Sequence, residues 1–494
     1  MENTATGTGT AQSDTKFLGH PRGLATLFFT EMWERYSYYG TRALLILFMT
    51  SHDHGGMGFS VVKAGAIYGF YTAMVYLLNL PGGWLADRVI GQRKAVLFGG
   101  VLISAGNFCL AAPNVMVFYA GLGLLMAGTG LLKPNVSTIV GQLYATGDKR
   151  RDSGFSIFYM GINLGALFSP LICGWVAAKF GWRMGFAVSG VGMVAGLIQY
   201  ALGGKHLGSA GLQPSSSGDP ARDRAQKRNG AIVAIAILLV LVVLGGLASA
   251  GIIQLTATAI GNGLGWVLLV ISVVVFSWMI FGRGWSAEER KRAVAILVLF
   301  VAAAIFWAAF EQAGSSLNLF GESKTNRHVL GYEFPAAWFQ FVQPAFVILL
   351  APLFAWLWLA LKRREPSSPA KFAFGLVLGG LAFAIMVPAA RGTQVSPLWL
   401  IGCYLLQTLG ELCLSPVGLS AMTKLAPARA AGFVMGIWFL ATSIGDWLAG
   451  KAGSLFESMP LPKLFGSVAA ISVVAAIILF LLVKPTKRLM SGVS

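Results

Sequence analysis

Charged residues are scarce in this chain. Of its 494 residues, 11% are charged and 56% are hydrophobic, and the mean hydropathy is +0.70. A soluble domain carries about 25% charged residues, so this composition excludes an ordinary soluble protein. The charges that are present lie mostly in clusters between long apolar runs. The chain is therefore predicted to be a membrane protein.

Cysteine and histidine are also scarce. The four cysteines lie in apolar runs without metal-ligand spacing, which favours small core residues: Cys109, Cys173, Cys403 and Cys413. The five histidines fall in loops or termini: His20, His52, His54, His206 and His328. The sequence shows no Ser/His/Asp, Cys/His or metal-spaced cluster. We therefore expect no enzymatic activity, no metal and no cofactor beyond a coupling proton.

Two further features are missing from the sequence. Residues 1–20 contain no apolar run before a cleavage site, so we do not expect a signal peptide. The chain also contains no basic soluble domain, although its formal net charge is +18 and its pI is 9.9. We therefore expect no nucleic-acid partner.

Fourteen apolar runs are long enough to cross a bilayer. They lie near residues 24–50, 60–86, 94–112, 114–143, 154–178, 183–202, 229–254, 264–283, 290–318, 334–362, 369–390, 396–424, 429–457 and 463–485. With both termini in the cytoplasm, that side holds 26 Lys and Arg residues, the other side holds 8, and 3 lie inside helices. This asymmetry predicts a multi-pass protein of the bacterial inner membrane with both termini cytoplasmic, and an attraction to anionic lipid.

The runs fall into three groups. Residues 1–202 hold six runs, and residues 290–494 hold six more. Between them, residues 203–228 are rich in Pro, Ser, Gly and charge, which predicts a flexible cytoplasmic linker. Residues 229–289 hold two extra helices that are apolar nearly all round, and we interpret these helices as lipid-facing spacers.

The loop after the second run has a characteristic order of glycines and charges. It reads Gly82-Gly83-Trp84-Leu85-Ala86-Asp87-Arg88-Val89-Ile90-Gly91-Gln92-Arg93-Lys94. This loop resembles the signature loop of the major facilitator superfamily. The resemblance implies an all-α membrane fold with twelve core helices in two six-helix bundles, plus the two extra helices, and alternating access by rocking of one bundle against the other. The sequence shows no convincing internal repeat.

Charges inside a membrane span are costly, by about 2.5 to 3.5 kcal/mol each on insertion scales, so each one is a candidate functional residue. The first run carries five polar residues at i, i+3, i+4, i+7 and i+11, which places them on one stripe of a helix: Glu31, Glu34, Arg35, Tyr38 and Arg42. This stripe is predicted to face a cavity. A purely structural ion-pair ladder is the alternative, above all for Glu34 with Arg35.

Four more charges lie within later runs. Lys133 precedes Pro134 in the fourth run, where a snorkelling lysine is the alternative. Glu311 lies in the ninth run. The twelfth run carries three polar residues on one face, at i, i+4 and i+8: Gln407, Glu411 and Ser415. Asp446 is either a site residue or an interfacial one.

The intramembrane charges are unbalanced. Five acids stand against three bases, which leaves two negative charges in excess if all are ionised. Burial and like charge both favour the protonated carboxyl group. At least one of these acids is therefore expected to bind a proton readily, as proton coupling requires.

Several segments together resemble one family. The run Glu31-Met32-Trp33-Glu34-Arg35-Tyr36-Ser37-Tyr38-Tyr39-Gly40 is similar to the E-x-x-E-R-F-x-Y-Y-G motif of the proton-dependent oligopeptide transporter (POT) family of the major facilitator superfamily. Residues 130–137, 155–165 and 410–416 match the same family. Tyr36 stands where the family usually has Phe. The resemblance implies proton-coupled import of di- and tripeptides.

The same resemblance implies roles for individual residues. Arg42 and Lys133 would hold the peptide carboxylate, and Glu411 would face the peptide ammonium. Further substrate-binding candidates are Asn163 for the peptide backbone, Tyr38, Tyr39, Tyr76 and Trp438 for side-chain pockets, and Ser415 and Gln343. Gln343 stands where relatives often have Asn, and an aromatic residue taken alone is more often a packing residue than a site residue.

The resemblance also implies how the proton couples to the peptide. Glu31, Glu34 and Glu311 are the proton candidates, and two ion pairs would gate the cavity: Arg42 with Glu311, and Lys133 with Glu411. Two alternatives stay open, namely a transporter of another small anion such as nitrate, and a membrane sensor that binds peptide without moving it. The expected partners are peptides, protons and lipid, and the chain is expected to be a monomer.

Overall fold

The computed structural model describes residues 15–145, 148–212, 256–329, 331–427 and 430–490, together with residues 214, 219, 221, 223–230 and 232. Most of the first predicted spacer helix, 229–254, and seven residues of the predicted linker, 203–228, lie outside the described residues. Everything below concerns the described part of the chain.

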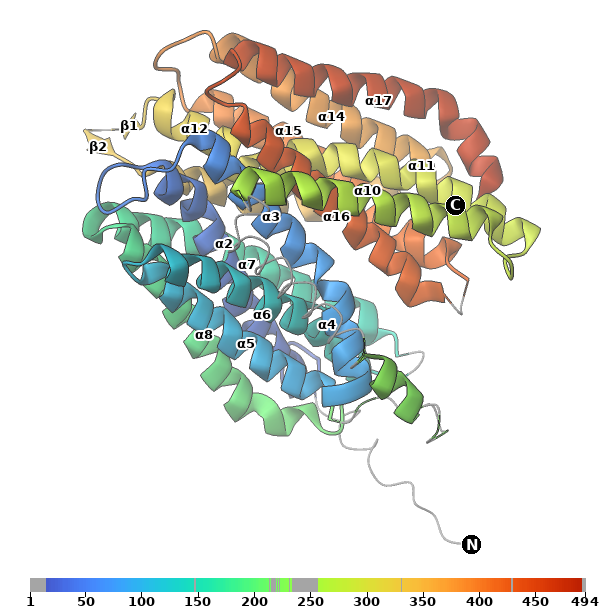
Figure 1. Cartoon of the computed structure of the whole chain (residues 1–494). Helices are drawn as coiled ribbons and strands as arrows, with labels where there is room; N and C mark the ends of the chain where they lie inside the picture. Colours follow the sequence, from blue (N-terminus) through green and yellow to red (C-terminus); the bar gives the residue numbers. More distant parts are fainter. Residues whose placement is uncertain are drawn as a thin grey trace, which may run out of the picture. The chain divides into compact units, whose positions relative to one another are not determined.

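The described chain is almost entirely helical (Figure 1). Its first half contains α2 (Arg22–Thr50), α3 (Val61–Leu77), α4 (Asn79–Leu85), the π-helix η1 (Ala86–Ile90), α5 (Gln92–Ala111), α6 (Val115–Gln142), α7 (Arg150–Phe180), α8 (Trp182–Gly203) and the 3-10 helix η2 (Gly204–Leu207). Its second half contains α10 (Ala257–Phe281), α11 (Ala287–Phe310), η3 (Glu311–Gly314), α12 (Ser316–Ser323), η4 (Ala336–Phe341), α13 (Val342–Leu361), η5 (Lys362–Arg364), α14 (Ser368–Ala389), α15 (Leu398–Leu425), α16 (Ala431–Ser454) and α17 (Leu461–Leu489). Between α12 and η4, strands β1 (His328–Val329) and β2 (Tyr332–Glu333) form a short antiparallel hairpin.

Length and composition explain the helices. Within the described residues, 12 helical segments are long and apolar enough to cross a membrane. Helix α2 has 29 residues, which is also long enough, but it carries Glu31, Glu34, Arg35 and Arg42 along its length. A helix satisfies its own backbone hydrogen bonds, which is the condition for crossing lipid. The prediction of a multi-pass, all-α membrane protein is confirmed.

The helices form two compact units. Unit 1 comprises Met1–Thr41, Leu78–Ser169 and Arg183–Ala259, and unit 2 comprises Arg42–Leu77, Pro170–Trp182 and Ile260–Ser494. The division therefore passes through α2 and α7. The predicted domain boundaries at residues 202, 228 and 289 stay a prediction.

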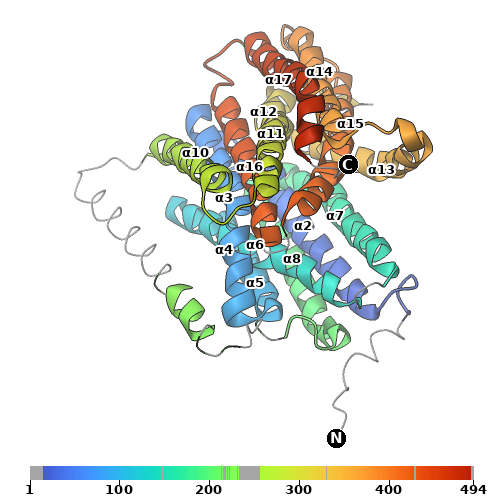
Figure 2. The same cartoon turned by 90° about the vertical axis from the view of Figure 1, so that its right-hand side faces the viewer.

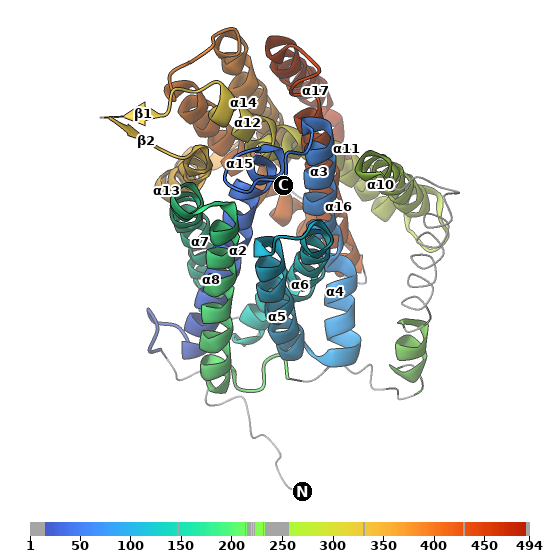
Figure 3. The same cartoon turned by 60° about the vertical axis from the view of Figure 1, so that its left-hand side comes forward.

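Glycines allow the helices of unit 1 to approach closely. Helices α5 and α6 lie side by side (Figures 1 and 3). A Cβ atom added at Gly99 of α5 would lie 2.6 Å from the carbonyl oxygen of Gly128 on α6, so a larger residue would force the helices apart. At the start of α5, Arg93 donates hydrogen bonds to the carbonyl oxygens of Ala210 at 2.6 Å and Gly208 at 2.5 Å. The first residues of the predicted linker are therefore held against unit 1.

Unit 2 contains a similar close contact between α3 and α16, which lie side by side in Figure 2. A Cβ atom added at Gly450 of α16 would lie 2.3 Å from the Cα atom of Gly69 on α3. One turn further on, the Ser454 hydroxyl donates to the carbonyl oxygen of Val62 at 3.3 Å. This contact joins a helix from the first half of the sequence to one from the second half.

Candidate functional site

The first half of α2 buries a charged cluster in unit 1. Arg35 donates from Nη2 to Glu34 Oε1 at 2.7 Å, and its Nε lies 3.5 Å from Glu31 Oε1. The Arg35 guanidinium also lies 4.9 Å from the centre of the Tyr38 ring. All of these side chains are buried. Two carboxylates therefore share one guanidinium, which leaves a net negative charge that a proton can cancel.

Other predicted residues of unit 1 lie around this cluster. The half-buried Lys133 of α6 acts electrostatically on Glu31. The rings of Tyr38 and Tyr39 meet edge to face at 5.2 Å. Asn163 of α7 is buried, and its Nδ2 donates to the carbonyl oxygen of Tyr159 at 3.0 Å. Its amide oxygen remains available as an acceptor.

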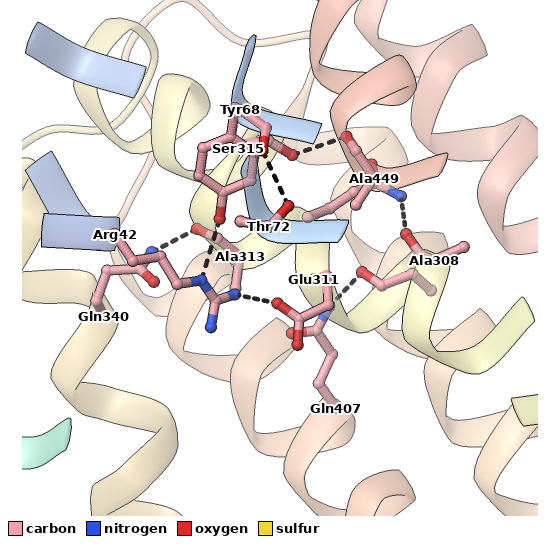
Figure 4. Close-up of polar contacts among 12 residues, drawn as sticks. Arg42, Tyr68, Thr72, Ala308, Glu311, Ala313, Ser315, Gln340, Gln407 and Ala449 are labelled. Atoms are coloured by element: carbon pink, nitrogen blue, oxygen red, sulfur yellow. Dashed lines mark hydrogen bonds and ion pairs between the residues drawn. The ribbon is translucent and has the colours of Figure 1, made fainter. Parts of the chain in front are cut away.

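A second charged cluster lies in unit 2 at the other half of α2. Arg42 Nη2 lies 2.7 Å from Glu311 Oε2, and the two side chains are only 3% and 4% exposed. Arg42 Nε also donates to the Tyr68 hydroxyl oxygen on α3 at 3.0 Å (Figure 4). The guanidinium is therefore held by one charged and one neutral partner.

The backbone around Glu311 is irregular. Helix α11 ends at Phe310, and the chain continues through the 3-10 turn η3 into α12. Backbone carbonyl groups need hydrogen-bond donors inside a membrane, and side-chain amides bond to three of those around this turn. The bonds run from Gln312 Nε2 to Ala308 O at 3.0 Å, from Gln407 Nε2 to Ala309 O at 3.2 Å, and from Gln340 Nε2 to Ala313 O (Figure 4). This turn fixes Glu311 beside Arg42.

Gly314 makes room for the Arg42 cluster. A Cβ atom at this position would lie 1.8 Å from the Tyr68 hydroxyl oxygen and 2.8 Å from Arg42 Nε. The next residue, Ser315, donates its hydroxyl to the carbonyl oxygen of Ala449 on α16 at 2.9 Å. Glu311, through its turn, is thus connected to α16.

The remaining predicted residues of unit 2 belong to α3, α13, α15 and α16. Glu411 of α15 is half-buried and interacts electrostatically with Glu311 and Arg42. Trp438 is buried against Phe372, with ring centres 6.3 Å apart. The other three candidates are half-buried: Tyr76, Gln343 and Ser415. Because Lys133 belongs to unit 1 and Glu411 to unit 2, their pairing stays a prediction.

Two residues of this region could not be assigned from the sequence. Tyr68 lies in an apolar run with no signal that distinguishes it from a packing residue. Asp446 was interpreted as either a site residue or an interfacial one, and its exposure is 0%. It acts electrostatically on Tyr68, which places it close to the Arg42 cluster.

Comparisons with known proteins identify the family of the chain. The model of the POT family matches residues 93–468. The peptide transporter YePEPT of Yersinia enterocolitica is 42% identical, over 96% of each chain, and a di-/tripeptide transporter of Lactococcus lactis subsp. cremoris is 37% identical, over 98% of this chain and 99% of its own. A crystal structure described as peptide transporter POT in complex with sulfate superposes with a TM-score of 0.91 at 42% identity, covering 98% of this chain and 99% of the other.

These similarities extend over nearly the whole chain and both of its halves. They confirm the major facilitator fold class that the signature loop at residues 82–94 predicted. They also agree with the motif at residues 31–40. The chain is a member of the POT family of membrane transporters.

Proposed function

We propose that this protein imports di- and tripeptides together with protons by alternating access. The observation that carries the proposal is the buried ion pair of Arg42 with Glu311, whose charged atoms are 2.7 Å apart, with the Tyr68 hydroxyl as a second partner of Arg42. The relatives named as peptide and di-/tripeptide transporters support the choice of substrate.

The chemistry of the pair supports proton coupling. A proton that binds to Glu311 removes the negative charge that holds the Arg42 guanidinium. A guanidinium is then available to a peptide carboxylate, which it can bind through two parallel hydrogen bonds. A proton and a peptide that both favour the same rearrangement provide the differential binding that shifts a two-state equilibrium.

The other charged residues fit the two ends of a peptide. Lys133 is a second cation for the carboxylate, and Glu411 is a counter-charge for the ammonium. Nitrate has no ammonium, so Glu411 beside the Arg42 cluster argues against nitrate as the substrate. A sensor would need a response element, whereas the twelve apolar segments account for most of the described chain.

Reconstituted protein tests the proposal directly. Liposomes with an imposed pH gradient, acidic outside, are expected to accumulate labelled dialanine and to leave free alanine and nitrate at the background level. Accumulation of nitrate in place of dialanine would favour the alternative anion. Binding of dialanine without any accumulation would favour the sensor.

Glu311→Gln tests the role of the ion pair. The variant is expected to lose proton-driven accumulation of dialanine and to keep exchange of labelled for unlabelled dialanine, because its neutral amide cannot release a proton. Glu457→Gln, a change at an exposed carboxylate, is the matched control and is expected to keep both activities. If Glu311→Gln retains accumulation, Glu311 does not carry the coupling proton.

A further inference from the structure

Helix α10 is the second of the two predicted extra helices, and one of its faces packs against α11 and α16 within unit 2. Leu264, Leu268, Phe276 and Met279 are buried in an apolar cluster with residues of α11 and α16. The opposite face carries exposed apolar side chains, among them Trp266, which is 69% exposed. The interpretation of this helix as a lipid-facing spacer therefore applies to one face only.

The start of α10 is attached to α16 by specific contacts. Trp447 Nε1 donates to the carbonyl oxygen of Gly261 at 2.7 Å, and Lys451 Nζ contacts the side-chain oxygen of Asn262. Gly265 lies directly on the Trp447 ring, since a Cβ atom there would be 2.2 Å from a ring carbon. Apolar packing alone does not fix the rotation and height of a helix in lipid, whereas these polar contacts do.

The same part of α16 makes the close contact with α3. Gly450 packs on Gly69, and a Cβ atom at Gly65 would lie 2.5 Å from the backbone nitrogen of Ser454. The carbonyl oxygen of Trp447 would lie 3.2 Å from a Cβ atom at Gly69. Trp447 therefore lies where α3, α10 and α16 meet, and the three helix segments share one end of unit 2 (Figures 2 and 3).

This junction is connected to the Arg42 cluster. Ala449 of α16 accepts the hydrogen bond from Ser315, which follows the turn that carries Glu311. Tyr68, which accepts the hydrogen bond from Arg42, precedes Gly69 at the contact of α3 with α16. A shift of α16 relative to α3 would therefore move groups on both sides of the ion pair.

We infer that α10 is a brace that holds α16 against α3, with Trp447 as the positioning residue. The inference rests on the alternating access of the proposed function, in which this end of the two predicted bundles must close and open. When α10 is displaced, α16 separates from α3 more often. This role is additional to any contact of α10 with lipid.

A single cysteine reports the separation. Ser454→Cys, with the four native cysteines replaced by serine or alanine, places a thiol between α16 and α3, where a membrane-impermeant maleimide reaches it only when the helices part. Gly265→Leu in this background forces α10 away from Trp447. We expect about a two- to tenfold faster alkylation, the factor that corresponds to the net free energy of one hydrogen bond.

Gly263→Leu is the matched control. It adds the same side chain to the same helix two residues away, where a Cβ atom would have nothing within 4 Å. We expect its alkylation rate to equal that of the parent. Equal rates for Gly265→Leu and Gly263→Leu in folded protein would overturn the inference.

Two milder variants and one transport assay complete the test. If Gly265→Leu gives no monodisperse protein, two other variants take its place, Trp447→Phe and Asn262→Leu, each of which removes one polar contact. If both variants are alkylated at the same rate as the parent, the inference is equally overturned. Uptake of dialanine by the parent is measured in parallel. A difference in alkylation without dialanine uptake would reject the proposed function and keep the brace, whereas uptake with equal alkylation would reject the brace alone.

Discussion

Arg42 is a buried charge whose partners are close and well placed. Removing two charges from water is costly, and excellent geometry with additional hydrogen bonds is needed to offset the cost. Arg42 has such geometry, with Glu311 on one side and the Tyr68 hydroxyl on the other. When one partner of a buried charge is removed, the remaining partners compensate only part of that charge, which is unfavourable.

Tyr68→Phe is predicted to impair transport although the aromatic ring is kept. The change removes the acceptor of the Arg42 Nε hydrogen bond, and a hydrogen bond to a charged group contributes about 1.5 to 3 kcal/mol. We expect proton-driven dialanine uptake to fall about tenfold or more, measured as initial rate per reconstituted transporter.

Tyr404→Phe provides the control for this prediction. Tyr404 is also a buried tyrosine of unit 2, but its hydroxyl has no hydrogen-bond partner among the described residues. Loss of an unbonded buried hydroxyl is nearly neutral or stabilising. A similar loss of uptake in the two variants would show that the Tyr68 bond has no special role.

His20 lies outside the membrane-spanning segments and is nevertheless only 6% exposed. Its Nδ1 lies 2.9 Å from the Tyr144 hydroxyl, and its Nε2 lies 3.3 Å from the Ser153 hydroxyl. Burial, together with the positive charge of Arg150, lowers the pKa of His20 below its ordinary value of 6.5, and Asp148 opposes this shift. Burial also raises the pKa of Tyr144 to about 12, so that hydroxyl stays neutral.

The lowered pKa of His20 predicts acid sensitivity. Below pH 6.5 the unfolded chain binds a proton that the folded His20 resists. Stability is therefore fully present above that pH and is lost as the pH falls through 6.5 towards the folded pKa. We expect the Tm of detergent-solubilised protein to fall less between about pH 7.5 and pH 5.5 in His20→Gln than in the wild type. His52→Gln, a change at an exposed histidine, is expected to follow the wild type, and identical pH slopes in all three proteins would contradict the prediction.

At the scale of the element, the apolar runs located the helices but not their interruptions. The run predicted at 60–86 is divided at Leu78 into α3 and α4, and the π-helix η1 follows from Ala86. The run predicted at 290–318 ends as an α-helix at Phe310 and continues through η3 and α12. Hydropathy measures side chains only, and it carries no information on which carbonyl groups a neighbouring glutamine can satisfy. The turn that holds Glu311 was therefore not predictable from its own segment.

The contacts between helices could not be predicted from the sequence either. Gly69 and Gly450 are two of 62 glycines, and the sequence does not show that these two lie in contact. A periodic pattern shows which face of a helix is polar, but the identity of the facing helix depends on tertiary packing. By contrast, the capping box at Ser286 and Glu289 is a local signal, and α11 begins there in the structure.

At the scale of the whole molecule, the fold class predicted from the sequence is confirmed, and the site residues stay a prediction. The structure distributes these residues over two units. The five polar residues of α2 were expected to form one stripe. In the structure Glu31, Glu34 and Arg35 belong to unit 1, whereas Arg42 belongs to unit 2 with Glu311. The spacing of residues along a helix predicts on which face each side chain lies. It does not predict which other helices lie beside each turn, so this division could be seen only in the tertiary structure.

The distribution of basic residues predicts the orientation of the molecule in the membrane. The basic residues number 26 on the predicted cytoplasmic side and 8 on the other, and such an asymmetry sets the orientation of helices near short loops. The start of α3, the start of α10 and the end of α16 meet at one end of unit 2, as an outward-facing position of all three requires. Alkaline phosphatase fused after Glu457, at the end of α16, is therefore expected to be active in the periplasm, and the same enzyme fused after Ser494 is expected to be inactive. Green fluorescent protein at the two positions should give the opposite result, and the reverse pattern for both reporters would show that the chain is inverted.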